Sequence, residues 1–391
     1  MDNSNASKIE IAIISFITNS SHLNYGAMLH GYAFQQYLLK EFNSPSIIID
    51  YFPKALEDEN LKYPILNKRQ NGSLNIEFLR KLNWLIGFRD NIKKWNKFKS
   101  FKNKYLTLTS KEYNYQELQS LEVESALDCK IFVCEADVIW KIIDVHNIDK
   151  NFFLSFPLAK GKIKVAYAPT ISSSSIEGEL LKKLKELTHD FYAISAREKL
   201  GSERLSSVLG RPVNYVLDPT LLLDADDYDK IAIPPKIEED YILLYTCTVN
   251  DRQMVKQVIE YGKQCNLKVI EIGNYSLNRF IIPHEVKVDI GVEEWLGYLK
   301  NAKMIISNSF HGFCFSVIFK KDFFVFERNK SDYRMPDLAN NLGLSNRLIP
   351  HDSKKIPADI SLINYQEVYD KLTQLRTQSK DFIKKNIIDK L

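Results

Sequence analysis

Short apolar segments alternate with amphipathic segments along most of the chain. Near-continuous apolar strands separated by helical patterns are typical of parallel sheets that helices cover on both faces. The pattern therefore predicts an α/β fold with strands at Ile9–Ile17, Ser46–Tyr51, Lys130–Glu135, Ile163–Ala168, Phe191–Ser195, Val213–Leu217, Tyr241–Cys247, Lys268–Ile272, Lys303–Ser307 and Phe323–Phe326. Helical spacing between them is clearest at Leu180–Leu187, Arg252–Cys265 and Trp295–Leu299.

The series of strands is interrupted once, near Asp224–Asp240, where two prolines and several acidic residues break the periodicity. A chain of 391 residues also exceeds what one ordinary core supports, which favours two domains of roughly 150–200 residues. We therefore predict two doubly wound, Rossmann-like α/β domains at residues 1–225 and 240–363. The last segment, residues 364–391, has helical spacing with Asn364 as N-cap; this helix could brace the two domains or serve a partner chain.

Composition narrows the classes of function. Apolar residues make up 45% of the chain and charged residues 26%, and a net charge of +4 is too small for a dedicated binder of duplex nucleic acid. Five cysteines without a CxxC pair indicate reduced thiols and no metal site. Because no apolar run approaches the ~20 residues of a membrane-spanning helix and the N-terminus lacks a charged leader, we expect a cytoplasmic protein.

One segment, residues 89–104, is strongly basic. It carries seven Lys or Arg residues and a single acidic one, with aromatic residues at helical spacing. A helix that packs its apolar side on the domain and leaves its lysines in solvent explains this pattern, and it is the favoured interpretation because such helices are common in cytosolic enzymes. The alternative is a peripheral contact with anionic lipid headgroups, to which each basic residue would contribute ~1 kcal/mol.

The most informative candidate site lies between Lys303 and Phe319. An apolar strand ends at Ser307, and a polar turn leads into an apolar helix. Ligands of open α/β sheets bind beyond the carboxyl ends of strands, where a helix N-terminus offers N–H groups to an anion. We expect this turn to bind a ligand through Asn308, Ser309, His311 and Gly312.

Four further turns follow strands in the same way. Arg197 lies just past one strand, where its guanidinium could hold a carboxylate or phosphate or could pair with a glutamate at the surface. Asp218 is well placed to cap its own turn, which favours a structural role. The turn Asn24–Ala27 opens a helix after the first strand, and Asp137, after the third, could hold a sugar hydroxyl.

Together these turns resemble the polysaccharide pyruvyl transferase family, over most of the chain from Asn24 to Arg347. The family's motifs lie in the right order in this sequence. They are N-Y-G-A-x-L-x-x-Y-A-x-Q at Asn24–Gln35, a V-R-E-like element at Ala196–Glu198, D-P-T at Asp218–Thr220 and S-F-H-G with F-S-x-x-F at Ser309–Phe319, followed by Arg334-Met335 and Gly343-Leu344.

This resemblance implies a glycosyltransferase-B-like arrangement, in which the two Rossmann-like domains face a cleft. It also implies an enzyme of exopolysaccharide or capsule biosynthesis that uses phosphoenolpyruvate as donor and no cofactor. The pyruvyl group would pass to two hydroxyls of one sugar, giving a cyclic ketal and phosphate. The acceptor would be a sugar or a lipid-linked oligosaccharide.

The same resemblance suggests a role for each candidate residue. His311 is the expected general acid/base, and Arg197 is expected to act with it by clamping the donor anions. The expected donor-binding residues are Arg197, Asn308, Ser309, His311, Gly312 and Arg334. The expected acceptor-binding residues, on the N-terminal domain, are Asn24, Tyr25, Gly26 and Asp137, and no metal is expected.

The chain departs from the family pattern at two places. Ser309 stands where many members carry an arginine two residues before the histidine. Cys134-Glu135-Ala136-Asp137 stands where related sequences carry a small, glycine- and serine-containing turn before the aspartate. Two other functions remain open: a nucleotide-sugar-dependent glycosyltransferase of the same fold, for which no nucleotide fingerprint is found, and a non-catalytic glycan-binding relative.

Overall fold

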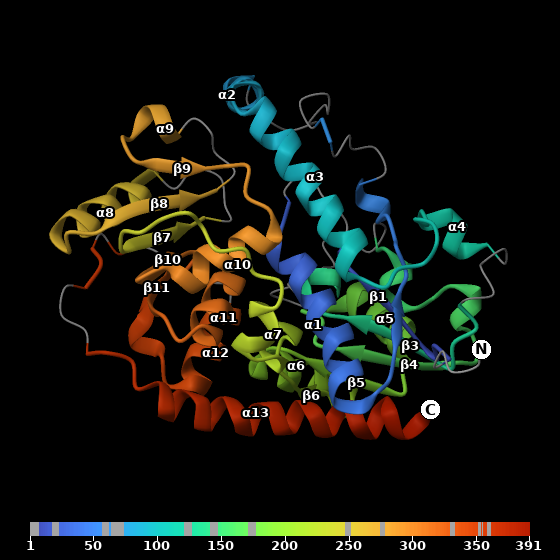
Figure 1. Cartoon of the computed structure of the whole chain (residues 1–391). Coiled ribbons are helices and arrows are strands. Elements are labelled where there is room, and N and C mark those ends of the chain that lie inside the picture. Colours follow the sequence, from blue (N-terminus) through green and yellow to red (C-terminus); the bar gives the residue numbers. More distant parts are fainter. Residues whose placement is uncertain are drawn as a thin grey trace, which may run out of the picture.

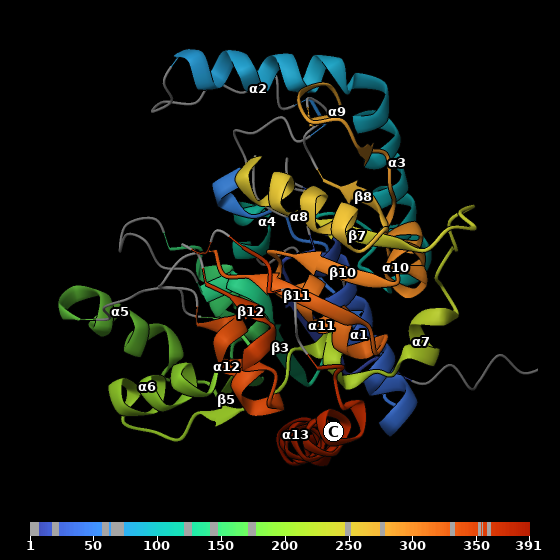
Figure 2. The same cartoon turned by 90° about the vertical axis from the view of Figure 1, so that its left-hand side faces the viewer.

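The computed structural model shows two α/β lobes that lie side by side, with one long helix running along both (Figure 1). Figure 2 shows the same cartoon turned by 90°. The structure describes residues 8–17, 23–56, 62–63, 74–120, 127–140, 148–170, 177–246, 252–273, 278–328, 333–350, 353, 355–357 and 361–391.

The first lobe is built on a six-stranded parallel sheet. Its strands are β1 (Ile11–Ser15), β2 (Ser46–Ile48), β3 (Ile131–Glu135), β4 (Ile163–Tyr167), β5 (Ala193–Ala196) and β6 (Asn214–Tyr215). They lie in the order β2-β1-β3-β4-β5-β6, and all neighbours are parallel. The order reverses between β1 and β3, so the carboxyl ends of these two strands flank a crevice.

The second lobe repeats this plan with the strand order of a Rossmann fold. Its strands are β7 (Tyr241–Tyr245), β8 (Lys268–Ile272), β9 (Glu285–Lys287), β10 (Met304–Ser307), β11 (Asp322–Phe326) and β12 (Leu348–Ile349). They lie in the order β12-β11-β10-β7-β8-β9, again all parallel. Here the order reverses between β7 and β10, which places a second crevice at the carboxyl ends of these strands.

Helices cover both faces of each sheet. The α-helices are α1 (Tyr25–Phe42), α2 (Leu74–Ile86), α3 (Phe88–Tyr105), α4 (Tyr115–Gln119), α5 (Gly178–Thr188), α6 (Lys199–Leu209), α7 (Ala225–Asp229), α8 (Arg252–Gln264), α9 (Asn278–Ile281), α10 (Val292–Asn301), α11 (Phe310–Ile318), α12 (Arg334–Leu342) and α13 (Tyr365–Asn386). The 3₁₀ turns are η1 (Lys54–Leu56), η4 (Asp137–Trp140), η6 (Lys150–Phe153), η7 (Pro157–Ala159), η8 (Pro219–Leu222), η9 (Ser345–Arg347) and η10 (Ile388–Lys390). No helix in the described ranges is long and apolar enough to cross a membrane.

The strands are apolar on both faces because both faces are buried. In β1, Ile11 and Ile13 point into one core, whereas Ala12 and Ile14 point into another. The first of these cores contains residues of both lobes and of the helices between them, so the lobes pack on each other through a continuous apolar layer.

Helix α13 braces the two lobes. Asn364 caps its N-terminus by accepting a hydrogen bond from the Gln366 amide. The Tyr369 hydroxyl donates to a carbonyl of α11 in the second lobe. Farther along the helix, the Arg376 guanidinium donates to two carbonyls of the first lobe, those of Leu221 and Leu223. Of the two roles predicted for this segment, the structure shows the bracing contacts.

Helix α3 contains the whole basic segment 89–104 and uses three of its lysines, Lys94, Lys97 and Lys102, for contacts within the protein. Lys97 Nζ donates to the Glu294 carboxylate at 2.7 Å and to the Asp289 carbonyl at 2.8 Å, which joins the two lobes. Lys94 and Lys102 are buried. The apolar side packs on the protein, and Arg89, Lys93, Lys99 and Lys104 are exposed, as the favoured interpretation predicts. It does not hold for Lys94, Lys97 and Lys102, which make contacts within the protein.

The predicted fold class is confirmed by the two parallel sheets and the helices that cover them. Each predicted strand has a counterpart, although Cys247, the predicted end of β7, lies outside the described residues. The pattern missed β9 and β12, because strands of three and two residues are too short to show a period. The division of the sheets falls between Tyr215 and Tyr241, around the interruption at Asp224–Asp240, while the domain boundaries themselves stay predictions.

We expect the brace of α13 to contribute measurably to stability. Arg376→Gln removes hydrogen bonds from a charged donor to two backbone carbonyls, each worth about 1.5–3 kcal/mol, and should lower the melting temperature by several degrees in differential scanning calorimetry. Lys380→Gln, one turn later, is the matched control: its ion pair with Glu41 is half exposed, so the melting temperature should change little. Equal shifts for the two variants would contradict this account.

Candidate functional site

A cavity of about 210 Å³ lies where the two crevices meet. Its lining comes from the carboxyl ends of β1, β3, β7 and β10, the four strands that flank the two reversals of strand order, and from the segments after β8 and β11. The residues are Leu23, Asn24, Tyr25, Lys94, Asp137, Tyr245, Thr246, Gly273, Ser309, Phe310, His311, Arg328 and Arg334. The two lobes thus build one site, at the position where open α/β sheets bind ligands.

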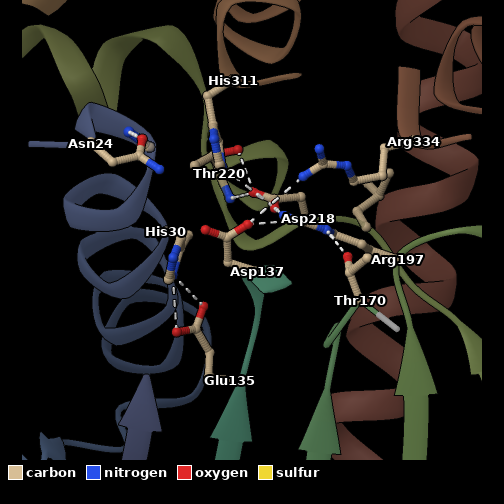
Figure 3. Close-up of polar contacts among 12 residues, drawn as sticks. Asn24, His30, Glu135, Asp137, Thr170, Arg197, Asp218, Thr220, His311 and Arg334 are labelled. Atoms are coloured by element: carbon tan, nitrogen blue, oxygen red, sulfur yellow. Dashed lines mark hydrogen bonds and ion pairs between the residues drawn. The ribbon is translucent and has the colours of Figure 1, made fainter. Parts of the chain in front are cut away.

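Asp218 connects the two lobes at the floor of this site (Figure 3). Its Oδ2 accepts a hydrogen bond from an Arg197 Nη at 2.5 Å and lies 3.7 Å from Nε2 of His311. Its Oδ1 accepts from the amide and the hydroxyl of Thr220 at 3.0 and 2.7 Å. The predicted cap of the D-P-T turn is therefore present. The same carboxylate is hydrogen-bonded to Arg197 and lies within ion-pair distance of His311, without a hydrogen bond to it.

Arg197 is buried among acidic and polar groups. Besides Asp218, its guanidinium donates to Asp137 at 2.9 Å and to the Thr170 hydroxyl at 2.7 Å, and it lies against the ring of Phe310. Its side chain is 0% exposed, and it is not part of the cavity lining. The sequence predicts a guanidinium in contact with the donor; the structure instead has it behind the cavity wall, with its hydrogen bonds used to hold two carboxylates.

The charges of this group stabilise one another. Burial raises the pKa of Asp137, but Arg197 and the His30 and His311 imidazoles lower it by more, so it lies below its ordinary value. At Asp218 burial again acts to raise the pKa, and His311, followed by Arg197, lowers it well below the ordinary range. Both carboxyls are therefore ionised at neutral pH, and removing one partner of such a buried pair costs ~3–5 kcal/mol.

Asp137 reaches Arg197 because of an unusual backbone. Ala136 and Asp137 have φ of 50° and 55°, the left-handed region that costs a residue with a Cβ about 1–3 kcal/mol. The resemblance implies a glycine- and serine-containing turn at this place, and glycine adopts such a conformation freely. Here the turn is held by hydrogen bonds from the Ala136 amide to the Tyr167 carbonyl and from the Thr170 amide to the Asp137 carbonyl.

His311 is clamped between the lobes. It lies in the first turn of α11 and is 5% exposed. A Cβ at Gly26, in the first turn of α1, would lie 1.9 Å from Nδ1 of His311, so the two helix N-termini meet with the imidazole against the glycine backbone. Gly26, which was predicted to bind the acceptor, is thus in direct contact with the His311 imidazole.

Some of the other predicted residues line the cavity, and some do not. Asn24 caps α1 by accepting from the Gly26 amide, and Ser309 begins α11; both line the cavity. Tyr25 also lines it, but its hydroxyl donates to the Ile290 carbonyl of the other lobe. Asn308 is 4% exposed and lies outside the lining. Gly312 allows the close approach of Ser307, whose Oγ would lie 2.3 Å from an added Cβ, and it lies outside the lining.

Three basic side chains line the cavity. Arg334, at the start of α12, lies 4.0 Å from Asp137, and Arg328 follows β11. Lys94 enters from α3 and lies over the Tyr25 ring, and burial lowers its pKa to about 7. Sequence reasoning found Arg334 but missed Arg328 and Lys94, because Lys94 belongs to a segment that looked like a solvated surface.

Sequence reasoning also missed a buried pair beneath the site. His30 in α1 binds Glu135 at the end of β3, with Nδ1 3.1 Å from both carboxylate oxygens, and both side chains are fully buried. The available signal was a histidine four residues after Gly26, since positions four apart share one face of a helix. Within the described residues, no group of three His, Cys, Asp or Glu side chains could hold a metal ion.

One family model matches most of the chain. The model of the family described as "Polysaccharide pyruvyl transferase" matches residues 24–331. The sequence matches none of the curated proteins.

Solved structures with a similar fold include sugar-nucleotide enzymes. UDP-GlcNAc 2-epimerase from Methanocaldococcus jannaschii has 11% identity and a TM-score of 0.42, over 94% of this chain and 92% of that one. UDP-GlcNAc 2-epimerase from Neisseria meningitidis has 11% identity and a TM-score of 0.46, over 95% and 93%. Arabidopsis thaliana UGT89C1, solved with UDP-L-rhamnose, has 9% identity and a TM-score of 0.48, over 96% and 94%.

The contact between Gly26 and His311 predicts a specific coupling. Gly26→Ala should lower the free energy of unfolding by about 1–3 kcal/mol, because its Cβ overlaps the imidazole. In a His311→Ala background the same change should cost much less, which a double-mutant cycle by thermal or urea unfolding would measure. An equal cost in both backgrounds would show that the two residues do not meet as described.

Proposed function

The chain belongs to the polysaccharide pyruvyl transferase family, and we propose that it transfers the pyruvyl group of phosphoenolpyruvate onto two hydroxyls of one sugar in a surface-polysaccharide precursor. The products are a cyclic ketal and phosphate. The observation that carries the proposal is a small cavity in which one histidine, His311, faces three basic side chains.

The basic residues suit a donor with two anionic groups. Phosphoenolpyruvate carries a carboxylate and a phosphate, which guanidinium groups bind in bidentate fashion. Arg334 and Arg328 approach from the segment after β11, and Lys94 from the other lobe. Because the pKa of Lys94 is about 7, a bound anion would favour its charged form. In this proposal these three side chains supply the positive charge that is missing at position 309, where Ser309 stands in place of an arginine.

The size of the cavity suits the small donor. The described residues line about 210 Å³ of a cavity that is open to solvent, and a three-carbon phosphate ester fits within this space. The N-terminus of α11, where Ser309 and His311 lie, adds the favourable dipole of a helix to anion binding.

His311 is the proposed proton donor. In the first step a proton passes from His311 to C3 of phosphoenolpyruvate, and C3 becomes a methyl group. A sugar hydroxyl oxygen bonds to C2 and loses its proton to the His311 imidazole, which is now neutral. In the second step the other hydroxyl oxygen bonds to C2 and loses its proton, while the bond from C2 to the phosphate oxygen breaks. Phosphate leaves with the electron pair of that bond and takes up the proton. General acid–base catalysis of this kind contributes about 10²–10⁴-fold.

The remaining residues serve these steps indirectly or bind the acceptor. Arg197, which holds Asp137 and Asp218, is a positioning residue in this proposal. Apart from Lys94 and Tyr25, the polar residues of the first lobe in the cavity lining are Asn24 and Asp137, so the acceptor sugar would approach from their side.

This function predicts phosphate release that depends on a sugar. With phosphoenolpyruvate and a panel of sugar acceptors, the wild-type chain should release phosphate only when an acceptor is present. His311→Asn should lower kcat by about 10²–10⁴-fold, and Arg334→Gln should raise KM for phosphoenolpyruvate by about tenfold or more, the worth of a hydrogen bond to a charged group.

Lys303→Gln is the control, since Lys303 is an exposed residue at the opposite end of β10. Turnover of a UDP- or GDP-sugar in place of phosphoenolpyruvate would assign the chain to nucleotide-sugar transfer instead. Stabilisation by sugars without phosphate release across the panel would indicate a glycan-binding protein.

We also propose that the protein works in the cytoplasm and rests on an anionic membrane, through a different surface from the lysines of α3. The corner between α2 and α3 exposes four large apolar side chains, Phe78, Leu85, Ile86 and Phe88, which are 66, 56, 40 and 44% exposed. Exposed Arg89 follows directly. Both views show this corner at the outer edge of the molecule (Figures 1 and 2). An apolar corner beside a cation suits the headgroup region of a bilayer.

Flotation with vesicles tests this surface. The chain should float with vesicles that contain phosphatidylglycerol, and the double variant Leu85→Glu/Phe88→Glu should lose most of that binding. Leu362→Glu is the matched control, because Leu362 is 84% exposed and lies far along the chain, just before α13. Equal flotation of the double variant, or a wild-type dimer that the double variant disrupts, would refute membrane contact at this corner.

A further inference from the structure

A second imidazole lies directly beneath His311. His30 is on the same face of α1 as Gly26, one turn later, and is fully buried. Its ring centroid lies 6.1 Å from that of His311, with the ring planes 27° apart. Figure 3 shows Glu135 below His30, and Asp137 between His30 and the Arg197 side of the site.

The hydrogen bonds of His30 are made on one side only. Nδ1 lies 3.1 Å from both oxygens of Glu135 and 3.5 Å from the Ser15 hydroxyl. Nε2 of His30 and Nε2 of His311 are both buried without a hydrogen-bond partner among the described residues. An unsatisfied buried polar atom costs free energy, and such atoms in a folded protein call for a functional explanation.

The charges around His30 favour its protonated form. The groups that face it are Glu135 from β3, Asp137 from η4, Asp218 before η8 and His311 from α11. Burial acts to lower the pKa of His30, but Glu135, with smaller contributions from Asp137 and Asp218, raises it above the ordinary value. The hydrogen-bonded Glu135 thus favours a charged His30 ring, which lies between Glu135 and His311 in Figure 3.

We propose that His30 and Glu135 are a positioning pair for His311, which holds a positive charge beneath the His311 imidazole and thereby favours transfer of its proton to the donor. The pair touches no substrate and acts through His311 alone. This role rests on the proposed pyruvyl transfer. A like charge 6.1 Å away disfavours the doubly protonated state.

The first test needs no activity. In NMR spectra of the chain with ¹⁵N-labelled histidine, His30 should carry protons on both ring nitrogens at pH 7. Glu135→Gln should make His30 neutral at that pH. A wild-type His30 that is neutral at pH 7 would overturn the proposal, and because this spectrum is taken on the wild-type chain it does not depend on whether a variant folds.

The second test follows His311 in the same spectra. His30→Asn keeps a donor near the position of Nδ1 but has no charge, and it should move the midpoint of the His311 titration upward by about one to two pH units, the value expected for two charges ~6 Å apart at an effective dielectric constant of ~20. His284→Asn, in the other buried His–Glu pair, is the matched control and should leave the midpoint unchanged. An unmoved midpoint in His30→Asn would refute the proposal.

The pH dependence of turnover separates this proposal from the proposed function. If pyruvyl transfer is observed, the alkaline limb of the wild-type profile should move upward in His30→Asn by the same amount as the His311 midpoint. Failure of all turnover would refute the proposed function while the NMR results still decide the pair. A shifted midpoint with an unshifted limb would show that the pair does not act on catalysis.

Discussion

The site depends on one buried carboxylate, that of Asp218. Its two oxygens accept hydrogen bonds from Arg197 and the Thr220 turn, and Oδ2 lies 3.7 Å from Nε2 of His311, so a single side chain contacts groups of both lobes. Such a carboxylate is stable in the interior only when its partners stay in place, because an unpaired buried charge costs several kcal/mol. The arrangement of the two lobes and the electrostatics of the site therefore depend on the same contacts. Arg197 takes part in these contacts through its hydrogen bonds to Asp137 and Asp218.

The packing around this carboxylate limits how far the lobes can move apart. Tyr25 stacks on Trp295 at 5.0 Å and donates to the Ile290 carbonyl, Gly26 supports the imidazole, and α13 spans the opposite side. A shared apolar core continues these contacts. A preorganised site of this kind loses little free energy to reorganisation when charge develops in a reaction.

The sequence predicted the parts of the structure that depend on local pattern. Buried parallel strands are apolar runs, so the two sheets and the turn before His311 could be read directly, and the motifs indicated the family. Contacts between distant segments could not be predicted. Nothing local shows that Lys94 of a basic helix enters the cavity, that Glu135 meets His30, or that Arg197 has its hydrogen bonds satisfied by Asp137 and Asp218. Gly26 and Gly312 were predicted to bind ligands, and the pattern did not show that Gly26 meets the His311 imidazole or that Gly312 meets the Ser307 side chain.

The most direct measurement is a crystal structure of the chain with phosphoenolpyruvate bound. The account predicts the donor in the cavity between the lobes, with its anionic groups against Arg334, Arg328 or Lys94, its C3 atom within reach of the His311 imidazole, and Arg197 still bound to Asp218. Donor density outside this cavity, or a donor bound by Arg197 after its release from both carboxylates, would contradict it.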